Sequence, residues 1–191
     1  MASISASVSS SDPMRYSTSL FVVLLATLSA VPCLAPLHAR GTYQTPERFL
    51  KQTFPDGAPK PAVVWMRGDV KKRVEAILGH RYPALRIRYW RRNGRSAWIL
   101  DEIGKSEAIT VGIFVAQGQI EKLRILIFRE SRGDEVRHPG FTRQFERAAL
   151  DAHGGLNTSI ESITGATLSV RAVKKLAILA LYLDSLTHDP A

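Results

Sequence analysis

The segment whose residue types most clearly suggest chemistry runs from Glu161 to Thr167 and reads Glu-Ser-Ile-Thr-Gly-Ala-Thr. Its pattern predicts a short extended piece, a glycine turn and the start of a long helix. Thr167 should lie at or near the N-cap, where free backbone N–H groups and the helix dipole attract anions. Gly165 and Ala166 leave room for another group to approach the backbone, so a phosphate is one candidate ligand. The alternative is that Thr167 is simply the N-cap of a core helix.

The same string resembles the flavinylation motif of FMN-binding domains, which occur in the periplasmic subunits of sodium-translocating quinone reductase and of the related ferredoxin-oxidising complex. The family pattern is an acid, two residues, Ser or Thr, and then Gly-Ala-Thr. This chain matches it with Glu161 where Asp is usual. In that family a dedicated flavin transferase joins FMN to the final Thr through a phosphoester bond. The resemblance therefore implies covalent FMN on the Thr167 hydroxyl and a flavin transferase as a maturation partner.

A second stretch, Glu130-Ser131-Arg132-Gly133 followed by Pro139-Gly140-Phe141, resembles the loop and helix that precede the flavinylated Thr. In larger members of the family this loop helps to frame the isoalloxazine ring. Taken alone, the stretch also fits an ordinary charged surface loop. The resemblance covers roughly residues 79–186. The cofactor-binding residues that it implies are Thr167, Glu161, Thr164, Gly165, Ala166, Leu168, Ser169, Arg171, Glu130, Ser131, Pro139 and Gly140.

The beginning of the chain has the layout of a secretory signal peptide. Arg15 precedes an apolar run over residues 20–30, and Leu37-His38-Ala39 offers a small residue before a break. We expect a signal peptide over residues 1–39, with Met14 as an alternative start, and one domain over residues 40–191. The alternative is an uncleaved membrane anchor. Either reading predicts a periplasmic location or the outer face of the cytoplasmic membrane.

The amino-acid composition limits which other kinds of functional site the chain can contain. The 191 residues include 26 Lys and Arg against 17 Asp and Glu, one Cys, and five His without ligand spacing. These counts argue against a disulfide framework and a thiolate metal site, and we assign no catalytic residue or metal ligand. Five arginines fall within residues 86–95, between aromatic residues. A nucleic-acid-binding module is one interpretation. In an exported protein we favour a solvated strand edge, or a docking face for an acidic or membrane partner.

The elements that must position these groups follow from hydrophobic periodicity. A helix is expected from Thr45 and Pro46, a short strand over residues 60–66, and a helix capped by Asp69 and stopped by Gly79. Alternating residues around Asn93-Gly94 predict a hairpin, and residues 108–116 and 120–128 add two strands. Ile109, Val111, Ile113 and Val115 should share one face of the sheet, and Leu123, Ile125 and Ile127 should point inward with them. Helices over residues 139–149 and 168–186 should cover that face.

These patterns predict an α+β domain with an antiparallel meander of about four strands packed against helices and a long C-terminal helix. The preferred function is an exported, FMN-bearing electron-transfer protein that exchanges electrons with a membrane-bound haem or quinone oxidoreductase. Such a protein is a carrier or an oxidoreductase subunit rather than a stand-alone enzyme, and nucleic acid is not an expected partner. The alternative is a non-catalytic adaptor or sensor domain that binds FMN non-covalently or not at all.

Overall fold

The computed structural model describes residues 41–187, so the predicted signal peptide lies outside the described residues. Six antiparallel strands form one sheet in the order β1-β6-β5-β4-β3-β2. The strands are β1 (Gly41–Thr42), β2 (Ala62–Trp65), β3 (Arg86–Arg92), β4 (Arg95–Ile103), β5 (Ala108–Ala116) and β6 (Gln119–Phe128). The predicted four-strand meander is confirmed as β3 to β6, and two short edge strands complete the sheet.

Tight turns set the register of the meander. Asn93 and Gly94 have φ of 50° and 71°, and Gln117 and Gly118 have φ of 52° and 73°. Positive φ at both central residues gives the hairpin a twist that matches its strands, which is why Asn-Gly is so favourable there. Between β5 and β6 the register shifts at Thr110/Val111 and at Phe114/Val115.

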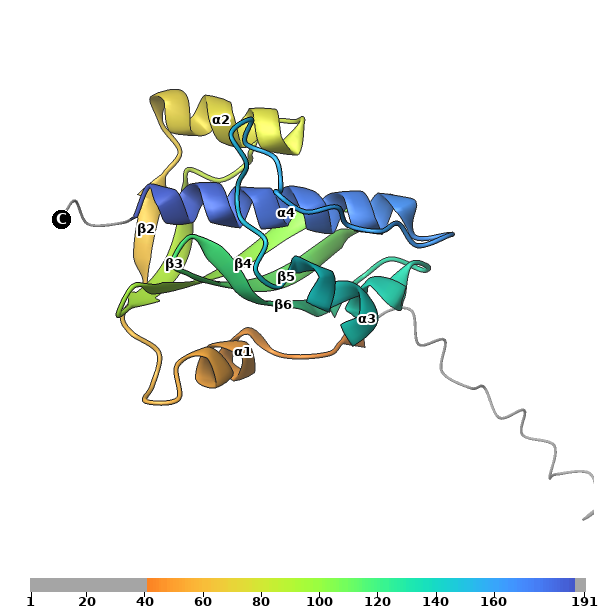
Figure 1. The fold of residues 1–191 in the computed structure, drawn as a ribbon, viewed down its shortest axis with the longest axis horizontal. Coiled ribbons are helices and arrows are strands. Elements are labelled where there is room, and N and C mark those ends of the chain that lie inside the picture. Colours follow the sequence, from red (N-terminus) through yellow and green to blue (C-terminus); the bar gives the residue numbers. More distant parts are fainter. Residues whose placement is uncertain (1–40, 188–191) are drawn as a thin grey trace, which may run out of the picture. The chain divides into compact units, whose positions relative to one another are not determined.

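Helices cover both faces of this sheet. The helical segments are α1 (Pro46–Thr53), α2 (Gly68–Leu78), α3 (Pro139–Thr142) and α4 (Thr167–Ser185), with short 3-10 turns η2 (Asp134–Arg137) and η3 (Arg143–Phe145). Figure 1 shows α4 lying along one face and α1 on the other. The main core lies between the sheet and α4, and it includes the row Ile109, Val111, Ile113 and Val115 as predicted. None of the described helices is long and apolar enough to cross a membrane.

The face opposite α4 carries a second, smaller core under α1. Thr45 caps this helix by accepting the N–H of Arg48 at 3.2 Å. Phe49 then packs directly on the sheet at Gly112, where an added Cβ would lie 3.0 Å from three of its ring atoms. Leu126 belongs to this second core and Ile127 packs against it. The prediction that Ile127 shares the inward face of Leu123 and Ile125 is therefore wrong, because the register shift changes its side.

The predicted helix over residues 139–149 is also wrong beyond its first turns. Phe141 and Phe145 have helical spacing and both are buried, but the chain leaves the helix after Phe145. There the backbone pairs with the start of β6. Arg147 donates its N–H to the carbonyl of Ile120 at 2.8 Å, and Ile120 donates to the carbonyl of Ala148 at 2.8 Å. These two hydrogen bonds replace the helical bonds that the periodicity favours.

Helix α2 differs from the expectation at its start. Helix α2 begins at Gly68 with Arg67 at the N-cap and no side-chain cap, so Asp69 lies within the first turn rather than capping it. Gly79 ends the helix at φ 75°, as predicted. Leu85 precedes β3 and is 77% exposed.

Helix α4 is fixed to the sheet by a buried polar group near its C-terminal end. Asp184 is 1% exposed and accepts hydrogen bonds from Arg91 at 3.0 Å and from Ser96 Oγ at 2.5 Å. Ser96 Oγ in turn accepts the indole N–H of Trp98 at 2.7 Å. A buried carboxylate is tolerated only when it is paired and hydrogen-bonded in this way. Arg91 therefore has a structural partner, unlike the purely solvated or docking role expected for the arginine cluster.

Candidate functional site

A cavity of about 280 Å³ lies where three distant segments meet. The segments are the β4–β5 turn, the loop after β6 and the start of α4. The residues that line it are Lys105, Glu130, Ser131, Arg132, Gly165, Ala166, Thr167, Leu168 and Ser169. Larger hollows of about 370 to 430 Å³ lie at the hairpin tips, beside β1 and beside α1, but none is lined by a residue of the two motif stretches.

The start of α4 presents free donors to this cavity. Ala166 occupies the N-cap and no side chain caps the helix. The first helical bond runs from Val170 N–H to the Ala166 carbonyl at 2.9 Å, so the N–H groups of residues 167–169 have no acceptor within the helix. Gly165, at φ 84°, turns the chain into the helix, and an added Cβ there would meet open space. This donor set and the helix dipole suit a phosphate group.

Thr167 is the first helical residue and its side chain is exposed. The alternative in which its hydroxyl caps the helix therefore does not hold, because the cap position belongs to Ala166 and no side-chain cap bond forms. A hydroxyl that is exposed, uninvolved in capping and beside free N–H donors is available for modification.

Glu130 holds the opposite wall of the cavity. Its Oε1 accepts the backbone N–H groups of Lys105, Ser106 and Glu107 at 2.5, 2.7 and 2.9 Å, and its Oε2 accepts the Ser106 hydroxyl at 3.2 Å. Burial alone would raise the pKa of this carboxyl, but the four hydrogen bonds outweigh that effect and lower the pKa. Glu130, predicted as a cofactor-binding residue, thus positions the β4–β5 turn while lining the cavity.

The loop after β6 is pressed against the helix start. Gly133 has φ 91°, and a Cβ there would lie 2.7 Å from Ser169 Oγ and 3.5 Å from Ala166. Only glycine fits this position without strain, because both the φ angle and the space exclude a side chain. Ser169 is only 4% exposed, because this loop packs against it at the start of α4.

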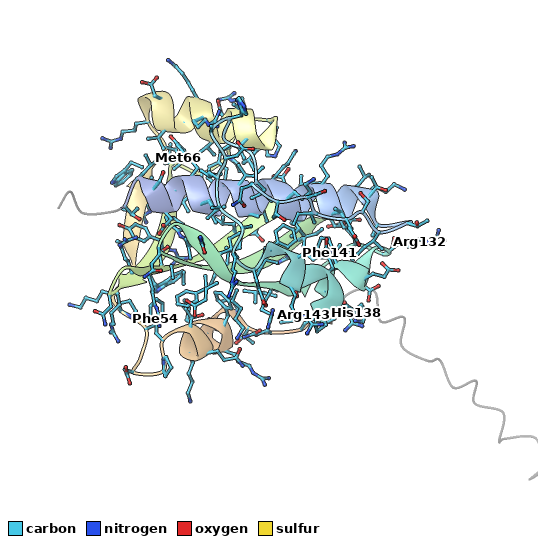
Figure 2. The ribbon with its side chains drawn as sticks, in the orientation of Figure 1. Phe54, Met66, Arg132, His138, Phe141 and Arg143 are labelled. Atoms are coloured by element: carbon cyan, nitrogen blue, oxygen red, sulfur yellow. The ribbon has the colours of Figure 1, made fainter. Side chains whose placement is uncertain are left out.

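Two cationic side chains that were not among the predicted site residues also line the cavity. Lys105 comes from the β4–β5 turn and Arg132 from the loop after β6. Figure 2 shows Arg132 at the end of the molecule where α4 begins. Arg132 lies within the motif stretch that the sequence singled out. No local sequence pattern pointed to Lys105, because its position beside the cavity depends on the hydrogen bond from its backbone N–H to Glu130, which is 25 residues further along the chain.

Five predicted site residues do not line the cavity: Glu161, Thr164, Arg171, Pro139 and Gly140. Glu161 and Thr164 are exposed in the segment before α4, where the backbone N–H of Glu161 donates to Gln144 Oε1 at 2.7 Å. The structure therefore brings together the second half of the motif and leaves its first half on the surface.

Comparison with known proteins agrees with this geometry. No match was found among the curated proteins or the solved structures. The family model of the FMN-binding domain matches residues 104–182, a range that begins in the β4–β5 turn and ends within α4. All nine residues that line the cavity fall inside this range. Residues 104–182 are therefore similar to the FMN-binding domain, and this similarity points to FMN as the group that the cavity would hold.

Proposed function

We propose that the chain carries FMN covalently on Thr167, works outside the cytoplasm, and exchanges electrons with a membrane-bound haem or quinone oxidoreductase. The observation that carries the proposal is the exposed Thr167 hydroxyl at the uncapped start of α4, beside a cavity lined by two cations. The family match supports FMN as the cofactor.

Attachment would proceed at Thr167 Oγ1. A new bond would form between this oxygen and the phosphorus of the flavin phosphate in a flavin dinucleotide donor. The phosphoanhydride bond of the donor would break, the nucleoside monophosphate would leave, and the hydroxyl proton would pass to a base of the transferase. A flavin transferase supplies the donor and the catalytic groups. The phosphate that remains is an ester anion, and the free N–H groups of residues 167–169 and the Lys105 and Arg132 side chains would offset its charge.

The two halves of the motif would have different tasks. Residues 165–169 face the cavity and would hold the cofactor, whereas Glu161 and Thr164 are exposed outside it and are accessible to a transferase. Bound FMN supplies one- or two-electron transfer, which needs no general acid or base from the protein. Leu168 lines the cavity and is 39% exposed, so it offers apolar surface to a flat ring.

The decisive measurement is the intact mass of the chain after co-expression with a flavin transferase. We expect a mass increase of one FMN less one water, lost in Thr167→Ala and retained in Thr167→Ser, which keeps the hydroxyl. Thr158→Ala, an exposed threonine outside the cavity, is the matched control and should keep the adduct. An unmodified chain, under conditions that modify another family member, would overturn covalent attachment and favour the adaptor or non-covalent alternative.

Location and partner need separate tests. A fusion of residues 1–60 to a reporter that is active only outside the cytoplasm should give activity. Loss of activity when Arg15 and the apolar run of residues 20–30 are deleted would support the signal. Reduction of the flavin by membranes, abolished by a haem or quinone-site inhibitor, would support the electron-transfer partner. Reporter activity that persists after the deletion would contradict export by this signal. Flavin reduction that is unchanged by the inhibitor would contradict the haem or quinone oxidoreductase as the partner.

A further inference from the structure

One corner of the sheet exposes an aromatic and an aliphatic side chain far from the cavity segments in sequence. Trp65 ends the edge strand β2 and is 44% exposed, and Leu85 is 77% exposed. The backbones of the two residues are neighbours at the end of this strand pair, because Met66 donates its N–H to the Leu85 carbonyl at 2.9 Å and Trp65 pairs with Arg86 across β2 and β3. We call Trp65, Arg67, Leu85 and Arg86 the Trp65 corner.

Two guanidinium groups flank the exposed indole. The Arg67 guanidinium carbon lies 4.8 Å from the centroid of the Trp65 ring, and that of Arg86 lies 6.0 Å from it. Within residues 41–187, neither guanidinium has a carboxylate partner. The whole chain has a formal net charge of +9, so this corner adds unpaired charge to a protein already attracted to anions.

This combination has the chemistry of a membrane-interface anchor. Indole rings favour the boundary between headgroups and acyl chains, leucine side chains favour the acyl region, and arginines favour anionic headgroups. A protein partner would need a pocket shaped for each protruding side chain, whereas a lipid surface accommodates them without one. We propose that the Trp65 corner docks the domain on an anionic lipid surface.

The docking surface and the FMN site are separate. Figure 2 shows Met66, which follows Trp65, and Arg132, which lines the cavity, toward opposite ends of the molecule. None of the four corner residues lines the cavity. Docking through the corner would therefore leave the cavity accessible to a redox partner, and the inference does not rest on flavin attachment.

The test uses the full 191-residue chain and vesicles of equal parts phosphatidylglycerol and phosphatidylcholine, measured by co-sedimentation at low salt. Trp65→Ala and the double variant Arg67→Ala/Arg86→Ala should each weaken binding roughly tenfold, the effect expected of removing an apolar anchor or two interfacial cations. The matched control is Arg48→Ala/Lys51→Ala on α1, which removes the same charge from two exposed positions and should change binding less than threefold. Leu85→Ser is a second apolar variant if Trp65→Ala unfolds.

Fluorescence reports insertion without interference from residues 1–40, because the three tryptophans are Trp65, Trp90 and Trp98, and Trp98 is fully buried. Brominated acyl chains should quench the wild-type emission, and Trp65→Phe should remove most of that quenching. Absence of binding to the anionic vesicles would overturn the proposal. So would an equal loss in the α1 control, which would show that only total charge matters. Binding to an acidic protein but not to vesicles, with the same dependence on Trp65, would instead identify a protein partner.

Discussion

Replacing Glu130 by Gln tests whether this buried carboxylate holds the wall of the cavity at the start of α4. The substitution keeps the size of the side chain and removes its charge. In the wild type, four donors converge on the carboxylate, three of them backbone N–H groups of the β4–β5 turn. A glutamine can present one carbonyl oxygen to these donors, but its amide nitrogen is itself a donor and faces the Ser106 hydroxyl.

The expected cost is about 2 to 3 kcal/mol of unfolding free energy at pH 7. A hydrogen bond to a charged group contributes roughly 1.5 to 3 kcal/mol, against about 1 kcal/mol for a neutral one. Weakening all four hydrogen bonds would therefore lower the unfolding free energy by several kcal/mol if the surrounding structure did not adjust. Rotation of the Ser106 hydroxyl and small movements of the turn recover part of this loss. Because the site is 4% exposed, solvent screening recovers little.

The effect has a defined pH dependence. The pKa of Glu130 is lowered from its ordinary value of about 4.5, so its stabilisation is fully present above that value and is lost as pH falls through the folded-state pKa. Denaturant unfolding of wild type and Glu130→Gln should therefore differ most at pH 7, and the difference should shrink as pH falls from about 4.5, the ordinary pKa of glutamate, through the lower folded-state pKa. Hydrogen exchange at residues 105–107 should rise in the variant.

Glu135→Gln, at an exposed position five residues further along the chain in η2, is the matched control and should change stability by less than about 0.5 kcal/mol. The reasoning is refuted if Glu130→Gln leaves stability unchanged at pH 7. A loss of the same size at pH 7 and pH 3.5 would refute it too, because the charge would then not be the cause.

Three further substitutions test the packing and charge of the rest of the domain. Gly112→Ala should destabilise by about 1 to 3 kcal/mol in denaturant unfolding, because its Cβ would press on the buried Phe49 ring; an unchanged midpoint would contradict that contact. Thr142→Val should leave stability unchanged or raise it by up to about 1 kcal/mol, because Thr142 Oγ1 is the only buried side-chain polar atom without a hydrogen-bond partner in residues 41–187. A marked loss of stability would show that this hydroxyl does have a hydrogen-bond partner. The pKa of His80 is raised by its hydrogen bonds to the Arg81 carbonyl and the Glu102 carboxylate. His80→Gln should therefore cost at most about 1 kcal/mol of stability below pH 6, and this cost should fade as pH rises through the folded-state pKa. A difference in melting temperature that does not change with pH would contradict the role of the charged imidazole.

The sequence predicted the parts of the fold that depend on local rules. Asn93-Gly94 indicated a hairpin because few residues other than Gly and Asn adopt the required positive φ, and both angles are positive in the structure. Thr45 and Pro46 indicated the start of α1 for an equally local reason, the satisfaction of free N–H groups. These signals need no knowledge of the remainder of the chain.

Features that depend on distant partners were not predictable in this way. The helical spacing of Phe141 and Phe145 continues past the point where the helix ends, because the competing hydrogen bonds come from Ile120 in another strand. The inward face of β6 changes at a register shift that alternation alone does not reveal. Tertiary backbone pairing overrides local propensity in both cases.

The candidate site also combines residues that local sequence could predict with residues that distant contacts bring into place. Residues 165–169 could be placed from the motif, because a glycine turn followed by a helical pattern fixes a helix start. Lys105 could not, because no local pattern links a strand turn to a carboxylate 25 residues away. A glutamate followed by a glycine-containing loop near the end of a strand is the weak signal that pointed to the right region.

The excess positive charge is distributed by geometry into groups with different roles. Arg91 is paired with the buried Asp184 and stabilises the fold, so it is not available for docking. Lys105 and Arg132 line the cavity, where their positive charge would lower the free energy of the proposed flavin phosphate. Arg67 and Arg86 flank the exposed Trp65 indole, and neither of them lines the cavity. A net charge of +9 therefore does not describe one basic patch. Because no residue of the Trp65 corner lines the cavity, mutations can test the proposed cofactor binding and the proposed surface docking one at a time.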